Sequence, residues 1–495
     1  MLKDIKNTIK QSAIYGLSRM AAKLISFVLL PLYSLNFSVA EYGIISRIET
    51  FWQILFALFL FGLESGIVRW YTKIDDSEQK KKFLFSVTLF LFITNLLFTV
   101  IFFFGTDFFS DLIFKSDKYS SLIFYASLIA SMEAFAFIFF LLLRINEKAA
   151  LYTFLSILAA VLNLSIQLYY ILYTDNKLDG VFIARVISPL VIIIILIPYY
   201  SGFLKAGLDL KNLKGLILYS IPVMFATLAG TLLNQSDRFI LGYLGNSTQV
   251  GLYSLAYNIC GLLNFMVIAP FGLAFTVLSW KKLKDKNALR FFTKNITYLF
   301  FTVTYLALIL SLSIPNLIKI FTLNNNYWYA KDIVPWISIA MPFYGISTIG
   351  FFSFYVSKKT YYILYIMLIS LVINVSLNII LIPFFNMYGA AVSNFVSFFL
   401  LCLITYRFSM KNYFFKYEWG KIFSMIFAFI ILVFPFYYFN LNEFTFLNII
   451  LKTVSVILFP VILYLLNFFE PVEIEGIKGL INKYIFHKNR LKKEE

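Results

Sequence analysis

The sequence predicts an all-α polytopic membrane protein with about 14 transmembrane helices, built from two parallel six-helix repeats and two further C-terminal helices. Three observations lead to this fold class: the hydropathy of the chain, the placement of its basic residues and an internal repeat. Of the 495 residues, 61% are hydrophobic and 14% are charged, and the mean hydropathy is +0.83. This composition leaves too little polar sequence for a sizeable soluble domain, so we expect the chain to lie in a lipid bilayer.

Apolar segments follow one another along the whole chain, and most of them contain about 20–30 residues. At a rise of about 1.5 Å per residue, a helix of this length crosses the hydrocarbon layer of a membrane. The expected spans are 11–35, 42–71, 83–104, 119–143, 149–173, 180–200, 215–235, 250–280, 291–314, 333–357, 360–383, 387–406, 422–439 and 447–468.

The basic residues between these spans predict the orientation of the chain. With the N-terminus in the cytoplasm, 30 of the 42 Lys and Arg residues fall on the cytoplasmic side and six fall on the outer side. Basic residues are enriched in cytoplasmic loops of membrane proteins. We therefore expect both termini to be cytoplasmic. The net charge of +17 reflects this distribution and does not indicate a nucleic-acid-binding protein.

The chain repeats itself at an offset of about 209–211 positions. The offset covers six spans, an even number, so both copies are expected to cross the membrane in the same sense. The predicted divisions are an N-terminal lobe (1–205, spans 1–6), a C-terminal lobe (206–415, spans 7–12) and a final segment (416–495) with two spans and a basic cytoplasmic tail. The matched positions include Gly62 with Gly272, Trp70 with Trp280, Asn163 with Asn374, Gly180 with Gly389, and Ser188 with Ser397.

Five basic residues lie inside the apolar segments, and all of them are in the first half of the chain. A base at the centre of a bilayer costs about 2.5–3.5 kcal/mol on insertion scales, so such residues usually face a polar cavity or an ion-pair partner. Snorkelling toward the headgroups is the alternative for the first two, and a cytoplasmic anchor is the alternative for the fourth. A basic cavity in a membrane protein favours an anionic passenger. The five residues are Arg19, Lys23, Arg47, Arg69 and Arg185.

Three acids accompany these bases: Glu49, Glu64 and Glu133. Arg47 and Glu49 are two residues apart and do not face each other on a helix, so each needs a partner on another helix. Glu133 lies near the middle of the fourth span, where an acid is a candidate functional residue. It can pair with Arg185 or Lys23, or it can couple transport to a proton or sodium gradient.

The second half carries almost no charge inside its spans. Asp237 and Arg238 lie toward the outer end of the seventh span. Asn163, Asn374 and Asn378 lie in the middle of helices, where interhelical hydrogen bonds are the favoured interpretation.

Several classes of protein are disfavoured by what the sequence lacks. His487 is the only histidine, so no histidine-based metal site or catalytic triad is expected. No glycine-rich nucleotide-binding motif is present, and no cofactor is expected. Cys260 and Cys402 are embedded in apolar segments, which does not favour a disulfide. The longest outer loop, predicted at 315–332, is too short for a catalytic domain.

The order of several short motifs resembles that of the polysaccharide-repeat flippases of the Wzx type, within the multidrug/oligosaccharidyl-lipid/polysaccharide (MOP) exporter superfamily. The resemblance covers nearly the whole chain. The motifs are Pro31-Leu-Tyr33, Glu41-Tyr-Gly43, Gly62-Leu-Glu-Ser-Gly66, Leu233-Asn-Gln-Ser-Asp-Arg238, Val250-Gly-Leu-Tyr253 and Tyr388-Gly-Ala-Ala391.

The resemblance implies a two-lobed fold like that of the MATE transporters and a function in surface polysaccharide synthesis, such as O-antigen or capsule. The passenger it implies is an undecaprenyl-diphosphate-linked oligosaccharide, moved across the bacterial inner (plasma) membrane by alternating access. A polysaccharide polymerase is an expected partner. Two alternatives stay open: a MATE-type drug or cation exporter, and a flippase for a peptidoglycan or teichoic-acid precursor. An enzyme is not expected.

Overall fold

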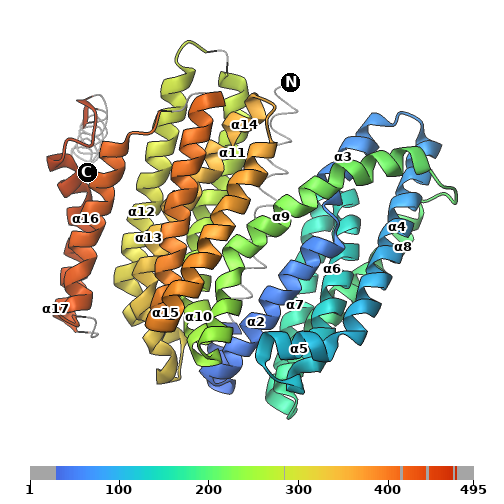
Figure 1. The fold of residues 1–495 in the computed structure, drawn as a ribbon, viewed down its shortest axis with the longest axis horizontal. Helices are drawn as coiled ribbons and strands as arrows, with labels where there is room; N and C mark the ends of the chain where they lie inside the picture. The colour runs from blue at the N-terminus through green and yellow to red at the C-terminus, as the bar shows by residue number, and fades with distance from the viewer. Residues whose placement is uncertain (1–28, 284, 413–415, 442–444, 472–473, 476–495) are drawn as a thin grey trace, which may run out of the picture. The chain divides into compact units, whose positions relative to one another are not determined.

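The computed structural model describes residues 29–283, 285–412, 416–441, 445–471 and 474–475. These residues form helices and loops, and no strand occurs among them (Figure 1). The helices are α2 (Val39–Phe59), α3 (Leu63–Lys73), α4 (Ser77–Phe104), α5 (Thr106–Phe114), η1 (Asp117–Tyr119), α6 (Ser120–Ile145), α7 (Ala149–Tyr173), α8 (Lys177–Ser201), α9 (Leu210–Leu244), α10 (Ser247–Leu263), η2 (Asn264–Ile268), α11 (Ala269–Lys282), α12 (Ala288–Phe321), η3 (Asn325–Ile333), α13 (Val334–Gly350), α14 (Phe352–Val356), α15 (Tyr361–Asn412), α16 (Trp419–Tyr438) and α17 (Phe446–Leu465).

Twelve helical segments among the described residues are long and apolar enough to cross a membrane. One of them, Tyr361–Lys411, contains two of the predicted spans. Asn386 separates the two, because its φ of 48° is not helical. The predicted span at 11–35 lies mostly outside the described residues. The all-α polytopic fold is thus confirmed, and the described residues account for all but the first of the expected spans.

The predicted outer loop at 315–332 is wrong in its extent. Helix α12 continues to Phe321, and η3 occupies Asn325–Ile333. Pro315 removes one backbone donor within α12, but it does not end the helix. Membrane helices tolerate such prolines where neighbouring segments satisfy the backbone, and Pro315 is buried against the rest of the protein.

Local sequence determines where α2 begins and ends. Ser38 accepts a hydrogen bond from the Glu41 backbone N–H, and the Glu41 carboxylate accepts one from the Ser38 backbone N–H, which is a capping box. The helix ends at Phe59, and the following turn contains Phe61 and Gly62, whose φ values are 56° and 64°. A Cβ on Gly62 would lie 2.6 Å from the backbone nitrogen of Met224, so α3 can follow closely along α9 only with glycine at this turn.

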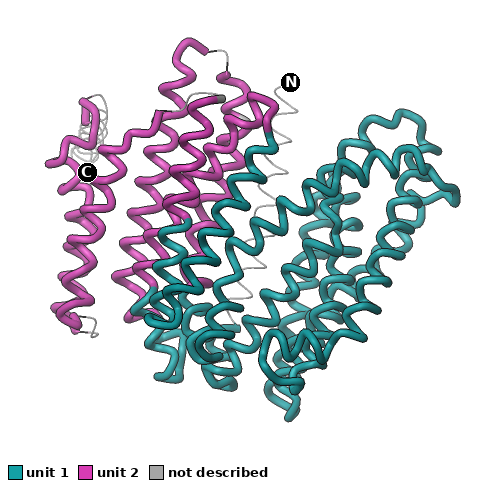
Figure 2. Tube along the Cα trace, viewed as in Figure 1, with its two compact units in different colours: residues 1–256, 319–333, 360–397 teal, residues 257–318, 334–359, 398–495 magenta. Residues whose placement is uncertain are grey.

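The described residues form two compact units (Figure 2). Unit 1 contains the described residues up to Ala256 together with 319–333 and 360–397. One part of its core lies among α3, α4, α6 and α8, where Leu63, Phe83, Leu142 and Ile192 are almost fully buried. The predicted division into lobes at 205 and 415 rests on the sequence repeat, whereas the two units are groups of residues in contact. The lobe division therefore stays a prediction.

Within unit 1, the backbones of α2 and α10 approach each other at two glycines. A Cβ on Gly43 would lie 1.8 Å from the carbonyl oxygen of Ser247, and a Cβ on Gly251 would lie 2.1 Å from the carbonyl oxygen of Val39. Side chains larger than hydrogen cannot occupy either position without separating the helices. Close crossings at glycine are common in membrane helix packing.

The glycine crossing relates equivalent positions of the two repeats. Ser46 of α2 donates a 2.6 Å hydrogen bond to Oγ of Ser254 on α10, which lies 208 residues later. Gly43 and Gly251 are separated by the same interval. The start of α2 thus packs on Gly251 of α10, and the start of α10 packs on Gly43 of α2. This reciprocal contact is typical of a two-fold interface. This contact supports a pseudo-two-fold relation between the copies.

Unit 2 contains 257–318, 334–359 and the described residues from 398 onward. Phe292, Phe300, Phe343 and Phe352 form part of its buried core. Both cysteines are free and buried, so neither forms the disulfide that the sequence disfavours.

A polar cluster at the start of α16 belongs to unit 2. The Lys294 ammonium lies 3.1 Å from Glu418 and also forms an ion pair with Glu470. Burial raises the pKa of Glu418, but hydrogen bonds donated by Thr297 and Lys294 outweigh it and hold the pKa below the ordinary value. The carboxylate is therefore ionised at neutral pH and connects α12 to α16.

Candidate functional site

Charged side chains of α2 and α8 meet inside unit 1. Nη2 of Arg185 on α8 forms an ion pair with Oε1 of Glu49 on α2. The guanidinium carbon also lies 5.1 Å from the centroid of the Trp52 indole. Glu49 and Trp52 are three residues apart and share a helical face. The two charged side chains are 16% and 23% exposed, so the ion pair is largely enclosed.

Glu133 of α6 joins this arrangement through Trp52. The indole Nε1 of Trp52 donates a 3.0 Å hydrogen bond to Oε2 of Glu133. Within the described residues, Glu133 forms no ion pair with a base. Arg185 therefore pairs with Glu49, and the indole lies between the arginine and the second acid. We call Glu49, Trp52, Glu133 and Arg185 the interior cluster; its members come from α2, α6 and α8.

A chain of hydrogen bonds adjoins the interior cluster. The Tyr33 hydroxyl donates a 2.5 Å hydrogen bond to Oε1 of Gln167 on α7, and Nε2 of Gln167 donates to Oδ1 of Asn163 one turn earlier. Tyr33 also interacts electrostatically with Arg185 and Glu49. The polar interior of the first repeat thus extends from α2, α6 and α8 to α7.

The second repeat contains a matching amide pair on α15. Nδ2 of Asn378 donates a 2.9 Å hydrogen bond to Oδ1 of Asn374, and the Ser236 hydroxyl of α9 donates to the same oxygen at 3.3 Å. All three residues are buried. The Ser236 contact is an interhelical hydrogen bond of the kind that the sequence predicts for Asn374.

Asp237 and Arg238 face α10 in the interior of unit 1. The Tyr253 hydroxyl donates a hydrogen bond to Oδ2 of Asp237, and Nε of Arg238 donates to Oγ of Ser254 at 3.1 Å. Both side chains are buried. Their contacts attach α9 to α10 beside the glycine crossing.

Arg47 lies apart from the interior cluster. It is 3% exposed, and its guanidinium carbon lies 4.4 Å from the centroid of the Phe114 ring of α5. The absence of a side chain at Gly242 makes room for it, because a Cβ there would lie 2.5 Å from Nε of Arg47. That Nε makes no hydrogen bond within the part of the chain that the structure describes.

Arg69 and Glu64 lie near the inner end of the second span. The Arg69 guanidinium lies 5.5 Å and 5.3 Å from the ring centroids of Trp70 and Tyr219, and the residue is exposed. Glu64 forms a 3.0 Å ion pair with Arg144 of α6, in which the side chains are 48% and 37% exposed. An exposed pair of this type contributes at most about 1 kcal/mol to stability.

Arg19 and Lys23 lie outside the described residues. Of the five predicted intramembrane bases, Arg185 is thus the one that the structure places in the interior cluster, and Arg47 and Arg69 lie elsewhere in unit 1. A role of these five bases in binding the passenger stays a prediction.

The sequence reasoning did not identify Trp52, Tyr33 or Gln167. Two of them carry a usable signal. Trp52 follows Glu49 by three residues and Gln167 follows Asn163 by four, so each shares a face with a polar residue already identified. Tyr33 belongs to the motif Pro31-Leu-Tyr33, but nothing in the sequence gives it a role in the site, because tyrosine is common near span ends.

A family model described as "Polysaccharide biosynthesis protein" matches residues 8–279, more than half of the chain. The chain belongs to this polysaccharide biosynthesis family. A search of curated proteins found no match.

Solved structures share the fold of this polysaccharide biosynthesis protein. The lipid II flippase MurJ, in an inward closed conformation, aligns with a TM-score of 0.71 and 16% identity over 92% of this chain and 99% of that one. An inward-facing multidrug resistance MATE family transporter of the MOP superfamily aligns with a TM-score of 0.60 and 15% identity, over 83% and 95% of the two chains. The Vibrio cholerae MATE transporter VcmN, in a mutant form, gives 0.58 and 16%, over 82% and 96%.

These likenesses establish the fold and, with the family, a multi-pass membrane protein of polysaccharide biosynthesis. They confirm the MATE-like fold that the motif order implies. The interior cluster then places one arginine and two acids inside a fold that transporters use. An arginine enclosed in a membrane protein can hold a phosphate through paired hydrogen bonds.

Proposed function

We propose that this polysaccharide biosynthesis protein is a flippase that moves undecaprenyl-diphosphate-linked oligosaccharide repeat units from the cytoplasmic to the outer leaflet of the plasma membrane. The match of its sequence to the polysaccharide biosynthesis family carries this proposal. A fold shared with a lipid II flippase supports it. The product serves the synthesis of a surface polysaccharide, such as O-antigen or capsule, and passes to a polysaccharide polymerase.

Arg185 is the first candidate for the anionic headgroup of the passenger. Its ion pair with Glu49 neutralises the guanidinium. A diphosphate carries more charge than a carboxylate and offers several acceptor oxygens, so it can replace Glu49 as the partner of Arg185. Arg19 and Lys23, together with Arg47 and Arg69, stay predicted contributors.

Glu133 is the candidate for coupling to a proton or sodium gradient. It is an acid inside a membrane span, the Trp52 indole donates a hydrogen bond to it, and no base forms an ion pair with it among the described residues. Binding of a cation would neutralise this carboxylate, and such neutralisation is favourable in an apolar environment. Glu64 is less suited, because it is exposed and paired with Arg144.

Alternating access requires a contact that closes one side and opens in the other state. In the predicted topology, α2 begins on the outer side, so the glycine crossing of α2 and α10 lies in the outer half of the membrane. We propose that this crossing closes the outer side and that it separates when the passenger leaves. Both termini are cytoplasmic in this arrangement.

Lipid extracts from cells that lack the gene test the proposal by mass spectrometry. We expect an undecaprenyl-diphosphate oligosaccharide to accumulate, and wild-type protein to reverse the accumulation. Arg185→Ala, Arg19→Ala and Glu133→Gln should fail to reverse it at equal protein levels. Lys177→Gln, which changes a base at the first residue of α8, is the matched control and should complement.

The same experiment separates the alternatives. Accumulation of a peptidoglycan or teichoic-acid precursor would replace the proposed passenger with that lipid. An unchanged lipid-linked pool with altered drug tolerance would contradict the proposal and favour a MATE-type exporter.

A further inference from the structure

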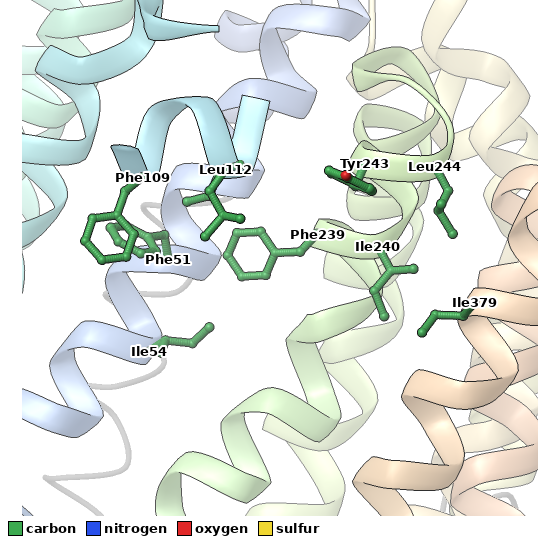
Figure 3. Close-up of a pocket in the computed structure, with 10 residues that line it drawn as sticks. Phe51, Ile54, Phe109, Leu112, Phe239, Ile240, Tyr243, Leu244 and Ile379 are labelled. Atoms are coloured by element: carbon green, nitrogen blue, oxygen red, sulfur yellow. The ribbon is translucent and has the colours of Figure 1, made fainter. Parts of the chain in front are cut away.

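An apolar cavity of about 620 Å³ lies in unit 1 among α2, α5, α9 and α15. Figure 3 shows side chains of α2 and α5 opposite those of α9 and α15, with Phe239 projecting toward Phe51 and Leu112. Nearly the whole lining is hydrocarbon. The volume falls within the range of about 300–1,000 Å³ that is typical of pockets for small molecules.

Two basic side chains border this cavity. The Arg47 guanidinium packs on Phe114 and against Gly242, which are chain neighbours of the lining residues Ile113 and Tyr243. Nζ of Lys115 lies 4.0 Å from the centroid of the Tyr243 ring and donates a 3.0 Å hydrogen bond to the Tyr243 carbonyl oxygen. The two cations therefore lie at the end of the cavity formed by α5 and the C-terminal turns of α9.

Neither cation has an acidic partner among the described residues. Arg47 is 3% exposed, and its Nε is enclosed without a hydrogen-bond acceptor. A buried guanidinium without a counter-ion is costly in a membrane protein. An anion that reaches Arg47 and Lys115 would supply the missing charge.

From these observations we propose that the cavity binds an anionic phospholipid of the outer leaflet, with an acyl chain between α2 and α9 and its phosphate at the exposed ammonium of Lys115, beside the buried charge of Arg47. The apolar lining fits the chain, and the two cations fit the headgroup. Arg47 lies eight residues after the start of α2, about 12 Å into the helix. In the predicted topology this depth lies in the outer half of the membrane, below the headgroups.

The passenger lipid fits this cavity less well than a phospholipid does. The volume suits an acyl chain better than a long polyisoprenoid. The inference therefore concerns a lipid of the surrounding bilayer, and it does not depend on which passenger the protein moves.

Titration of the purified full-length chain in detergent, followed by native mass spectrometry, tests the inference. The probes are palmitoyl-oleoyl phosphatidylglycerol, the matching phosphatidylcholine and undecaprenyl phosphate. We expect phosphatidylglycerol to bind at least tenfold more tightly than phosphatidylcholine. Arg47→Gln and Lys115→Gln should each weaken phosphatidylglycerol binding about tenfold, and Leu112→Trp, which fills the cavity, should weaken the binding of both phospholipids.

Two control variants separate this site from general lipid binding. Lys177→Gln removes a base from the outer end of α8, and Leu96→Trp enlarges an exposed side chain of α4; neither should change binding. If Arg47→Gln does not fold, Lys115→Gln and Leu112→Trp decide the question. Equal binding of the two phospholipids, or binding that none of the cavity variants alters, would overturn the inference. Preferential binding of undecaprenyl phosphate that Leu112→Trp abolishes would also overturn it.

Discussion

Both repeats contain a pair of amide side chains one helical turn apart, but in different surroundings. Gln167 donates to Asn163 on α7, and Asn378 donates to Asn374 on α15. The second pair is fully buried, whereas Asn163 of the first pair is half-buried. The two pairs are related by 211 positions. In the first copy the pair continues through Tyr33 toward charged residues. In the second copy it ends at the Ser236 hydroxyl.

The two repeats also differ in their charged residues. Arg185 of the first repeat corresponds to Asn394 of the second, at the 209-residue offset that also relates Gly180 to Gly389. Asn394 is fully buried, and neither atom of its amide group makes a hydrogen bond within the described residues. The Arg185–Glu49 ion pair therefore has no counterpart at Asn394, although the packing positions of the two copies correspond.

The largest expected effect on stability comes from breaking the ion pair between Arg185 and Glu49 of the first repeat. Arg185→Leu leaves the Glu49 carboxylate without its base. Breaking a buried pair in this way costs about 3–5 kcal/mol, and partial exposure of this pair places the expected loss near 3 kcal/mol. The free energy of unfolding of the purified protein in mixed micelles, measured by detergent titration, provides the comparison.

Asn394→Leu is the matched control in the second repeat. It removes an amide that has no partner among the described residues, so we expect a change of less than about 1 kcal/mol or a gain in stability. Adding Glu49→Gln to Arg185→Leu should restore most of the lost stability. A loss for Asn394→Leu as large as that for Arg185→Leu would show that the two copies do not differ as proposed.

Alanine substitutions at the two glycines of the α2–α10 crossing should each cause an intermediate loss of stability, and the two losses should be similar. Gly43→Ala and Gly251→Ala each place a Cβ within about 2 Å of a backbone oxygen of the other helix, and overpacking of this kind costs about 1–3 kcal/mol. Because the contact is symmetric, both variants should lose similar stability in the same titration.

Gly230→Ala is the control for the glycine variants. No atom lies within 4 Å of a Cβ built at this position on α9, so alanine should be neutral or raise helix stability slightly. Markedly unequal losses at Gly43 and Gly251 would argue against a symmetric crossing.

The smallest expected loss of stability comes from the two amide pairs, and variants there can separate an effect on stability from an effect on transport. Asn163→Ala and Asn374→Ala each remove one acceptor in a membrane interior, which costs about 1 kcal/mol. Both variants should lose this amount, whereas Asn163→Ala should also slow clearance of the lipid-linked pool, because it adjoins the interior cluster. Equal transport by the two variants at equal protein levels would remove the proposed link between the first amide pair and function.

Much of the fold could be predicted from the sequence, because the hydropathy and charge of each segment can be read along the chain without knowing its neighbours in space. The length of an apolar segment determines whether it can cross a bilayer, and Gly43 and Gly251 already appear in matching motifs. The loop predicted at 315–332 is shorter in the structure, because α12 continues past Pro315 to Phe321.

The candidate site could be predicted only in part. The sequence establishes that Glu49 needs a partner on another helix, because a separation of two residues directs Arg47 to a different face. It does not establish which helix supplies that partner. Both Glu49 and Glu133 were available to Arg185, and the structure pairs it with Glu49.

The sequence by itself determined the fold class, the expected orientation, the repeat and the concentration of charge in the first half. Only the tertiary structure decided that Trp52 lies between Arg185 and Glu133, and that Arg47 packs on Phe114 beside an apolar cavity. The physical reason is that helical periodicity fixes the face on which a side chain lies. Its neighbour depends on how the helices rotate and cross when they pack, and that is settled by contacts between residues far apart in the chain.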